Sequence, residues 1–256
     1  MSILSVKIEL LSPTLLAATP PASNLSETLL FIPGNTLRGV LARRYLAQNN
    51  NNADADFQTL FITGQTKFGF GLPDGAHFLP LSARSCKYDG GFHNDDEHGV
   101  VDLLLRDQSE LRCAYEDQDK CGAPIDYLKG FWRPKHHQKT EVHTRLTTRT
   151  AIDPRRGTAH SGMLYSQRVV EEGQCFFARI ESTNDLLTRL TALLVKPFTA
   201  RIGTGTSRGQ GWVKVSRAQN LADDSDYWGT ALDRYKRYED IRNHQGKTQL
   251  VVTLLS

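Results

Sequence analysis

A glycine-rich stretch towards the C-terminal side of the sequence constrains the fold more than any other feature. Residues 203–211, which we call the glycine loop, lead directly into the alternating strand pattern of residues 212–215, and they contain four glycines: Gly203, Gly205, Gly209 and Gly211. Glycine permits positive φ and close backbone approach, so such a loop can present several main-chain N–H groups in one concavity. Together with hydroxyls and flanking arginines, it favours an anionic ligand such as a phosphate backbone.

Two familiar nucleotide-binding loops do not fit the glycine loop. A P-loop needs a lysine directly after its second glycine, and no lysine follows a glycine here at that spacing. A dinucleotide fingerprint starting at Gly203 would meet Arg208 where its third glycine belongs. That fingerprint also lies between a strand and a following helix, whereas this loop follows the helical pattern of residues 184–196 and precedes a strand. A hairpin connection without a ligand is the alternative that the loop by itself leaves open.

Basic residues are concentrated in the middle of the chain. The 256 residues carry a net charge of +3, with 39% hydrophobic and 23% charged residues, as in an ordinary globular protein. Between residues 133 and 168, however, eight lysines and arginines and four histidines stand against only two acidic residues, Glu141 and Asp153. Such a polybasic region suits a polyanionic partner. A solvated basic face is the alternative interpretation.

The N-terminal region and the cysteines indicate a cytoplasmic protein without a membrane partner. The apolar pattern of residues 3–11 is too short for a signal peptide or a membrane span, and Lys7 and Glu9 interrupt it. The chain has four cysteines at scattered spacings, which argues against a secreted disulfide scaffold.

The hydrophobic pattern predicts an α+β fold. Residues 3–11 alternate as a half-buried strand, residues 163–170 and 175–180 predict two further strands, and residues 184–196 predict a helix. With the helix described next and the strand after the glycine loop, the order is strand, helix, strand, strand, helix, glycine loop, strand. This is the split βαβ arrangement of ferredoxin-like folds, whose open sheet face often binds RNA.

The first helix is expected to begin near residue 36, with Asn35 or Thr36 as its N-cap. A helix N-terminus is a second potential anion site, and Arg38 lies close to it. The structural alternative for Arg38 is a surface salt bridge.

Residues 57–140 form the least regular part of the sequence and are expected to be a large insertion on the core. Cys86, Cys113 and Cys121, with His93 or His98, are ligands of the kinds that zinc prefers. No Cys-x2-Cys pair is present, and the spacing from Cys113 to Cys121 is loose. We therefore interpret the cysteines as buried free thiols and expect no cofactor, with zinc as the alternative.

Several of these motifs together resemble the RAMP superfamily of CRISPR-associated proteins. They are residues 32–39 (Ile-Pro-Gly-Asn-Thr-Leu-Arg-Gly) and the glycine loop, and residues 149–165 resemble the corresponding hairpin of type III RAMP subunits. Residues 79–81 (Leu-Pro-Leu) and the pair Cys86-Lys87 point to the type III-D subunit related to the Cas-five-like class, which binds the crRNA 5′ handle. The resemblance covers most of residues 1–217.

The resemblance implies a non-catalytic RNA-binding subunit of an antiviral type III effector ribonucleoprotein. Its implied partners are crRNA, the RAMP backbone subunits and the large subunit, with target RNA as an indirect partner. The predicted RNA-binding residues are Asn35, Thr36, Arg38, Arg145, Arg149, Arg155, Arg156, His160, Arg201, Gly203, Thr204, Gly205, Thr206, Ser207, Arg208 and Gly209.

Two other functions remain open at this stage. Some RAMP proteins are endoribonucleases that act on pre-crRNA or target RNA, with or without a metal, and His160 and Asp153 are the candidate catalytic residues, followed by His136 and His137. A purely structural scaffold subunit is the other alternative.

The sequence also predicts a domain boundary near its end. Residues 1–217 are expected to form the RAMP domain, and residues 218–256 a further helix and strand. Residues 250–256 echo the first strand, which suggests the start of a second RAMP half. A coincidence between two short amphipathic strands is the alternative.

Overall fold

The computed structural model describes residues 2–18, 25–92, 97–103, 112–115, 121–133, 136, 138–152 and 159–218, with the backbone alone at 151–152 and 159–164. The chain divides into two compact units. The first unit comprises residues 1–75 and 142–221, and the second comprises residues 76–141 and 222–256. The predicted helix and strand within 218–256 lie outside the described residues, except for Ala218. Among the described helices, none is long and apolar enough to cross a membrane.

The first unit is built on an antiparallel sheet in the order β14-β15-β1-β13-β3, with β4 also paired to β13. The strands are β1 (Ser2–Leu10), β3 (Lys67–Phe68), β4 (Leu72–Pro73), β13 (Cys175–Ser182), β14 (Phe198–Arg201) and β15 (Trp212–Arg217). In β1, every second residue from Leu4 to Leu10 is buried, which confirms the alternation predicted for the first strand. The strand β14 was not predicted, and residues 163–170, predicted as the second strand of the ferredoxin-like order, lie instead in a strand of another sheet.

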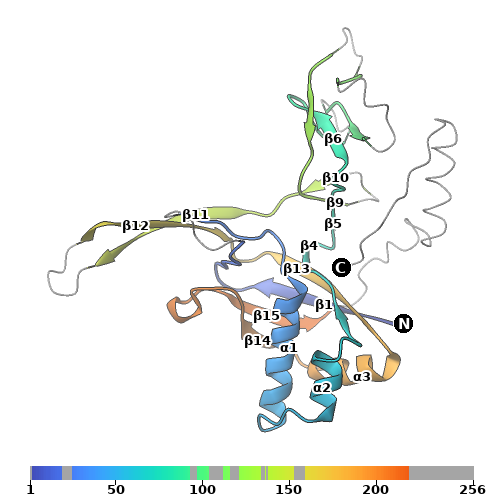
Figure 1. Cartoon of the computed structure of the whole chain (residues 1–256), viewed down its shortest axis with the longest axis vertical. Helices are drawn as coiled ribbons and strands as arrows, with labels where there is room; N and C mark the ends of the chain where they lie inside the picture. The colour runs from blue at the N-terminus through green and yellow to red at the C-terminus, as the bar shows by residue number, and fades with distance from the viewer. Residues whose placement is uncertain are drawn as a thin grey trace. The chain divides into compact units, whose positions relative to one another are not determined.

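Two helices cover one face of this sheet (Figure 1). They are α1 (Gly34–Gln48) and α3 (Asn184–Leu193), and a shorter helix, α2 (Ala55–Phe61), packs beside α1. The buried side chains of α1 and α3, such as Leu41 and Leu190, form one cluster with the inward residues of β1, β13 and β15. The core of the first unit therefore lies between the sheet and its helices.

The start of α1 differs from the predicted one. Its N-cap is Pro33, without a side-chain cap, and the helix begins at Gly34, so the prediction of Asn35 or Thr36 as N-cap is wrong. The carbonyl of Pro33 already accepts the amides of Thr36 and Leu37, at 2.9 and 3.2 Å. Close packing fixes this entry, because a Cβ added to Gly34 would lie 2.0 Å from the carbonyl oxygen of Phe68.

The short helix α2 has a charged cap. Asp54 accepts a hydrogen bond from the amide of Phe57 at 2.9 Å, and the hydroxyl of Tyr45 donates to the same carboxylate at 2.9 Å. The Phe57 amide is the main cause that lowers the pKa of Asp54, and Tyr45 adds to it. Burial, helped by Asp54, raises the pKa of Tyr45 to about 12.

This cap predicts an acid-sensitive contribution to stability. The folded-state pKa of Asp54 is below its ordinary value of 3.8, so the cap contributes fully above that value and is lost as pH falls through the lowered pKa. Asp54→Asn retains an acceptor at the N-cap but does not titrate. Urea unfolding at a series of acidic pH values measures the free energy of unfolding of both proteins. The difference by which the wild type exceeds Asp54→Asn should shrink as pH falls. A difference that stays constant with pH would contradict this assignment.

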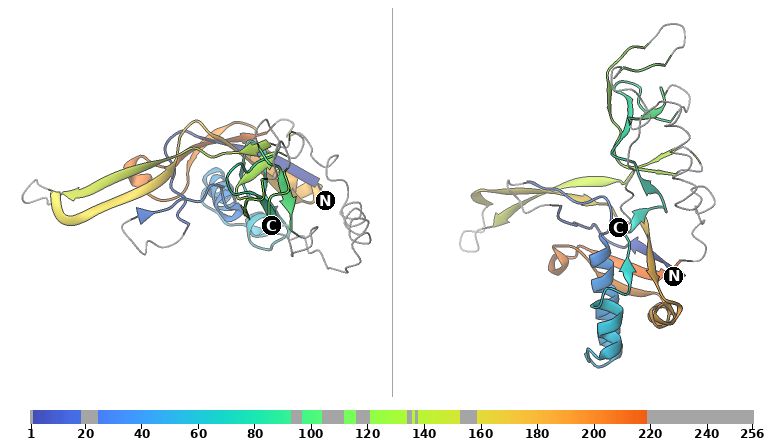
Figure 2. Two further views of the ribbon diagram at one scale, coloured as in Figure 1. Left: turned by 90° about the horizontal axis from the view of Figure 1, so that it is seen from above. Right: turned by 45° about the vertical axis from the view of Figure 1, so that its right-hand side comes forward.

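A long hairpin forms the second sheet of the first unit. Strands β11 (Thr144–Ile152) and β12 (Ala159–Val170) pair in antiparallel fashion, and β2 (Leu25–Ser26) pairs parallel to β12. The hairpin extends beyond the main sheet of its unit in each view (Figure 1, Figure 2). Its base is fixed by two 2.9 Å backbone hydrogen bonds between Thr14 and Val170, both fully buried.

The second unit contains two small antiparallel sheets. One has the order β10-β9-β5 and the other β7-β6-β8. Their strands are β5 (His77–Phe78), β6 (Ala83–Cys86), β7 (Val100–Asp102), β8 (Ile125–Tyr127), β9 (Phe131–Arg133) and β10 (Gln138–Thr140). Residues 57–75, which were expected in the same irregular insertion, instead contain α2 from Phe57 onwards, β3 and β4, and belong to the first unit. The aromatic side chains of Phe57 and Phe68 account for this, since both pack against its core.

Candidate nucleic-acid interface

The glycine loop is the connection of the hairpin formed by β14 and β15. It does not follow the third helix directly, as the sequence had suggested, because β14 lies between them. All four glycines have positive φ, between 73° and 84°, as their residue type predicts. Gly205 and Gly209 bound a single 3-10 turn, η2 (Thr206–Arg208).

Two of the four glycines, Gly203 and Gly211, are required by close contacts with backbone atoms inside the protein. A Cβ would lie 2.2 Å from the Leu15 carbonyl oxygen at Gly203, and 2.0 Å from that of Ile202 at Gly211. At Gly205 it would lie 2.2 Å from the amide oxygen of Gln210. At Gly209, by contrast, it would meet nothing within 4 Å. Close backbone packing, rather than a ligand, therefore explains Gly203 and Gly211.

Several main-chain donors of the loop are also used within the protein. The amide of Thr204 donates to Leu15 at 2.9 Å, that of Arg208 to Gly205 at 2.9 Å, and that of Gly211 to Pro13 at 3.0 Å. The main-chain cradle for an anion is thus smaller than the sequence predicts. The outward chemistry of the loop rests mainly on the side chains of η2, where Ser207 and Arg208 are exposed and Thr206 is half-buried.

A side-chain hydrogen bond joins the loop to the hairpin. A guanidinium nitrogen of Arg208 donates to the hydroxyl oxygen of Tyr165 on β12, at 3.0 Å. Tyr165 lies directly opposite Arg149 in the register of β11 and β12, and opposite residues of an antiparallel pair share a face. Two arginines and an aromatic ring from three segments therefore meet on one surface, which we call the Arg208–Tyr165 surface. Proteins bind single-stranded RNA with cationic side chains that contact its phosphates and aromatic rings that stack on its bases.

Two of the predicted arginines have internal partners that change their role. Arg201 lies over the ring of Trp212, 4.3 Å from its centroid, and remains exposed. Arg145 forms an ion pair with Glu172 at 3.1 Å, so part of its charge is neutralised at the base of the hairpin. Arg145 is therefore a weaker phosphate ligand than its sequence context suggests, whereas Arg201 is held in place by stacking.

The residues predicted at the first helix are not joined to the Arg208–Tyr165 surface. Asn35 and Arg38 are exposed and Thr36 is half-buried in the first turns of α1. Among the described residues, no hydrogen bond or ion pair connects Arg38 to the glycine loop or the hairpin. The salt bridge considered for Arg38 is likewise not formed within this part of the chain.

Most of the remaining candidates lie outside the part of the chain whose side chains the structure describes. Asp153, Arg155, Arg156 and His137 lie outside the described residues, and His160 is placed on β12 by its backbone alone. His136 is exposed and belongs to the second unit. Tyr165 was missed as a site residue because its alternating strand pattern does not reveal which face meets the glycine loop.

The four candidate zinc ligands do come together. Cys86, His98, Cys113 and Cys121 present sulfur and nitrogen atoms that all lie within 4.8 Å of one another. Burial by itself would raise the pKa of Cys86, but the amides of Asp89 and Tyr88, and the His98 and Cys121 side chains, hydrogen-bond to its sulfur and lower that pKa to about 7. Burial raises the pKa of Cys113.

The chain resembles known proteins in sequence and in structure. The family model for the RAMP superfamily matches residues 7–214. A chain of the type III-B Cmr-beta complex in its apo state superposes with a TM-score of 0.50 at 12% identity, covering 85% of this chain and 98% of that one. A chain of Cmr-beta bound to cognate target RNA superposes with a TM-score of 0.49 at 9% identity, covering 84% of this chain and 97% of that one. Pyrococcus furiosus Cmr4 (Cas7) superposes with a TM-score of 0.39 at 12% identity, covering 86% of this chain and 100% of that one. Curated protein sequences give no significant match. At 12% identity, the similarity to the chain of the apo-state Cmr-beta complex shows a similar fold and nothing more.

Proposed function

Because the chain belongs to the RAMP superfamily, we propose that it is a non-catalytic RNA-binding subunit of a type III CRISPR effector ribonucleoprotein. The observation that carries the proposal is the contact between Arg208 and Tyr165, which places the glycine loop against the basic hairpin. The structural relatives include a type III-B complex bound to cognate target RNA. By extension, crRNA, neighbouring effector subunits and, indirectly, target RNA are the proposed partners.

The Arg208–Tyr165 surface would hold RNA by its backbone and its bases together. Arg208 and Ser207 are exposed and suited to phosphate oxygens. The half-buried ring of Tyr165, whose hydroxyl is held by Arg208, offers a surface for stacking a base. Contacts of these kinds grip a strand without reading its sequence.

The finer assignments are proposals of the same kind. The order β15-β1-β13-β3, antiparallel throughout, supports a ferredoxin-like core, with residues 76–141 as its insertion. The III-D subtype and the Cas-five-like role at the crRNA 5′ handle rest on residues 79–81 and the pair Cys86-Lys87. We also propose a cytoplasmic location.

RNA binding across salt tests the role of Arg208. The full chain is titrated with an RNA that carries the repeat-derived 5′ handle and with a scrambled RNA. Each lost phosphate contact should flatten the slope of log affinity against log salt by roughly 0.7 for a single strand. We therefore expect Arg208→Ala to bind more weakly and with a flatter slope.

Arg217 provides the matched control. It is also exposed, but it lies at the end of β15 that is remote from the glycine loop. Arg217→Ala should keep the wild-type slope. If Arg208→Ala keeps it too, the glycine loop does not bind phosphate and a scaffold function is favoured. Preference for the handle RNA over the scrambled RNA tests the Cas-five-like role, and cleavage of either RNA would contradict the non-catalytic assignment.

A further inference from the structure

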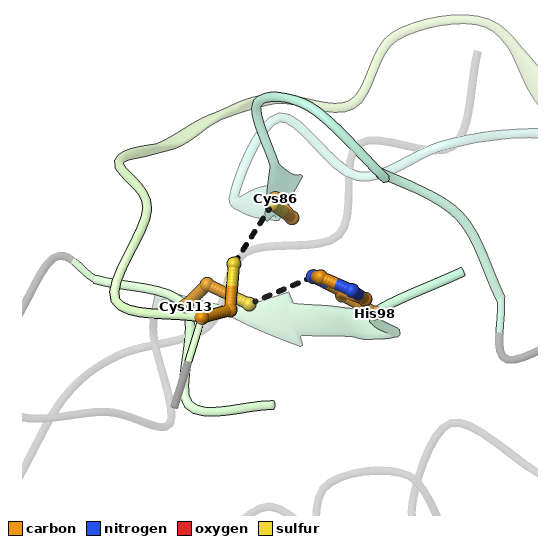
Figure 3. Close-up of side chains that lie close together, drawn as sticks. Cys86, His98 and Cys113 are labelled. Carbon is orange, nitrogen blue, oxygen red and sulfur yellow. Dashed lines mark hydrogen bonds between the residues drawn. The ribbon is translucent and has the colours of Figure 1, made fainter. Parts of the chain in front are cut away.

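The second unit contains a cluster of side chains that the proposed RNA-binding function does not use. We propose that Cys86, His98, Cys113 and Cys121 bind one structural zinc ion. Their four ligand atoms all lie within 4.8 Å of one another. Figure 3 shows the side chains of Cys86, His98 and Cys113 converging on one place. Three thiols and an imidazole are a common ligand set of structural zinc.

Two distances in the cluster match those of a zinc tetrahedron. With Zn–S near 2.3 Å and Zn–N near 2.0–2.1 Å, tetrahedral coordination separates two sulfurs by about 3.8 Å and a sulfur and a nitrogen by about 3.5 Å. The sulfurs of Cys86 and Cys121 are 3.8 Å apart, and the sulfur of Cys113 is 3.5 Å from Nδ1 of His98. A disulfide would instead bring two sulfurs to about 2.05 Å, and all of these cysteines are free thiols.

The surroundings of two ligands, His98 and Cys86, suit a metal. The other ring nitrogen of His98, Nε2, lies 3.9 Å from a carboxylate oxygen of Asp89, which favours the tautomer with a free lone pair on Nδ1. The ring of Tyr115 stacks on that of His98, with centroids 4.2 Å apart. The amides of Asp89 and Tyr88 donate to the sulfur of Cys86. Such hydrogen bonds also stabilise a metal-bound thiolate.

Backbone pairing explains how ligands with such loose spacing meet. Cys86 ends β6, and His98 precedes β7, the strand that pairs with β6. The segments that carry Cys113 and Cys121 are joined to each other by two backbone hydrogen bonds. The amide of Cys113 donates to Ala123 at 2.8 Å, and the amide of Cys121 donates to Tyr115 at 3.1 Å.

The local core gives the ion a structural role. The buried members of this apolar cluster are Cys86, Cys113 and Ala123, so two of its three buried side chains are themselves ligands. A region with so little apolar surface to bury gains stability from a metal that links its strands. Four protein ligands also leave no open position for a substrate, which is typical of structural rather than catalytic zinc.

Metal content of the purified full-length chain tests the proposal. We expect about one zinc per chain by elemental analysis after dialysis under reducing conditions, and loss of that zinc in Cys86→Ser and Cys121→Ser. Cys175 is the matched control, because it lies on β13 of the first unit, outside the cluster. Cys175→Ser should retain the zinc. None of these measurements involves RNA, so they do not depend on the proposed function.

Cobalt replacement keeps the test decisive if the cluster variants do not fold. Wild-type chain reconstituted with cobalt(II) should show the visible and near-ultraviolet absorption of a tetrahedral thiolate site, and zinc should remove it. Folded wild-type chain that binds neither metal would overturn the proposal. So would stoichiometric iron in place of zinc, or a zinc loss in Cys175→Ser as large as that in Cys121→Ser.

Discussion

Gly211→Ala is expected to lower the free energy of unfolding by about 3 kcal/mol or more, among the larger effects of a single substitution. Gly211 has φ of +75°, and an alanine Cβ would lie 2.0 Å from the carbonyl oxygen of Ile202. Backbone atoms cannot move aside locally, because Ile202 donates its amide to Gly211 at 2.9 Å and Gly211 donates its own to Pro13 at 3.0 Å. The glycine loop would separate from β14 and from the segment after β1. Chemical denaturation of the two proteins measures the loss.

Gly209→Ala is the control within the same loop. Gly209 also has positive φ, +84°, but an added Cβ would meet nothing within 4 Å. Only the backbone cost of a left-handed alanine remains, about 1–2 kcal/mol. Equal losses at Gly209 and Gly211 would show that conformation alone, and not close packing, selects glycine in this loop.

Gly34→Ala is expected to have a comparably large effect, about 3 kcal/mol or more of unfolding free energy. Here φ is not positive, and the whole cost comes from the approach of α1 to β3. The alanine Cβ would lie 2.0 Å from the carbonyl oxygen of Phe68 and 3.2 Å from that of Gly69. Because both are backbone atoms, α1 or β3 would have to shift, and the core between helix and sheet would be disturbed. Denaturation monitored by helical circular dichroism reports the change.

Gly39→Ala, on the same helix, is expected to raise the free energy of unfolding instead of lowering it. Gly39 is exposed, and an added Cβ would meet nothing within 4 Å. Alanine is more favourable than glycine in a helix interior by about 1 kcal/mol, so this variant should be more stable than the wild type. If Gly34→Ala were equally harmless, the proposed contact between α1 and β3 would be wrong.

Local patterns were sufficient to predict much of the first unit. The alternation of β1 and the apolar face of α3 follow from single-residue periodicity, and both elements bury the side chains that the pattern indicates. The start of α1 was predicted wrongly, because cap preference at Asn35 and Thr36 competes with a tertiary contact at Gly34. The oxygen that decides it belongs to Phe68, more than thirty residues away, and no local rule contains that information.

The candidate sites show the same limit. Residue type alone predicted positive φ at the four loop glycines, but not the carbonyls of Leu15 and Ile202 that exclude a side chain at Gly203 and Gly211. The partner of Arg208 could not be foreseen either, since Tyr165 is 43 residues away and becomes its neighbour only through the hairpin. At the cysteine cluster the ligand types were visible, whereas their convergence depends on the pairing of β6 and β7.

Photochemical crosslinking of bound RNA tests the central claim most directly. The full chain, in its ribonucleoprotein, is irradiated with its RNA, digested and analysed by mass spectrometry for peptides that carry a nucleotide. We expect crosslinks on Tyr165 and on peptides from the glycine loop, because a stacked ring and the side chains beside it contact the strand. Crosslinks confined to other segments, with the RNA fully bound and both peptides recovered unmodified, would contradict an RNA-binding role for the Arg208–Tyr165 surface.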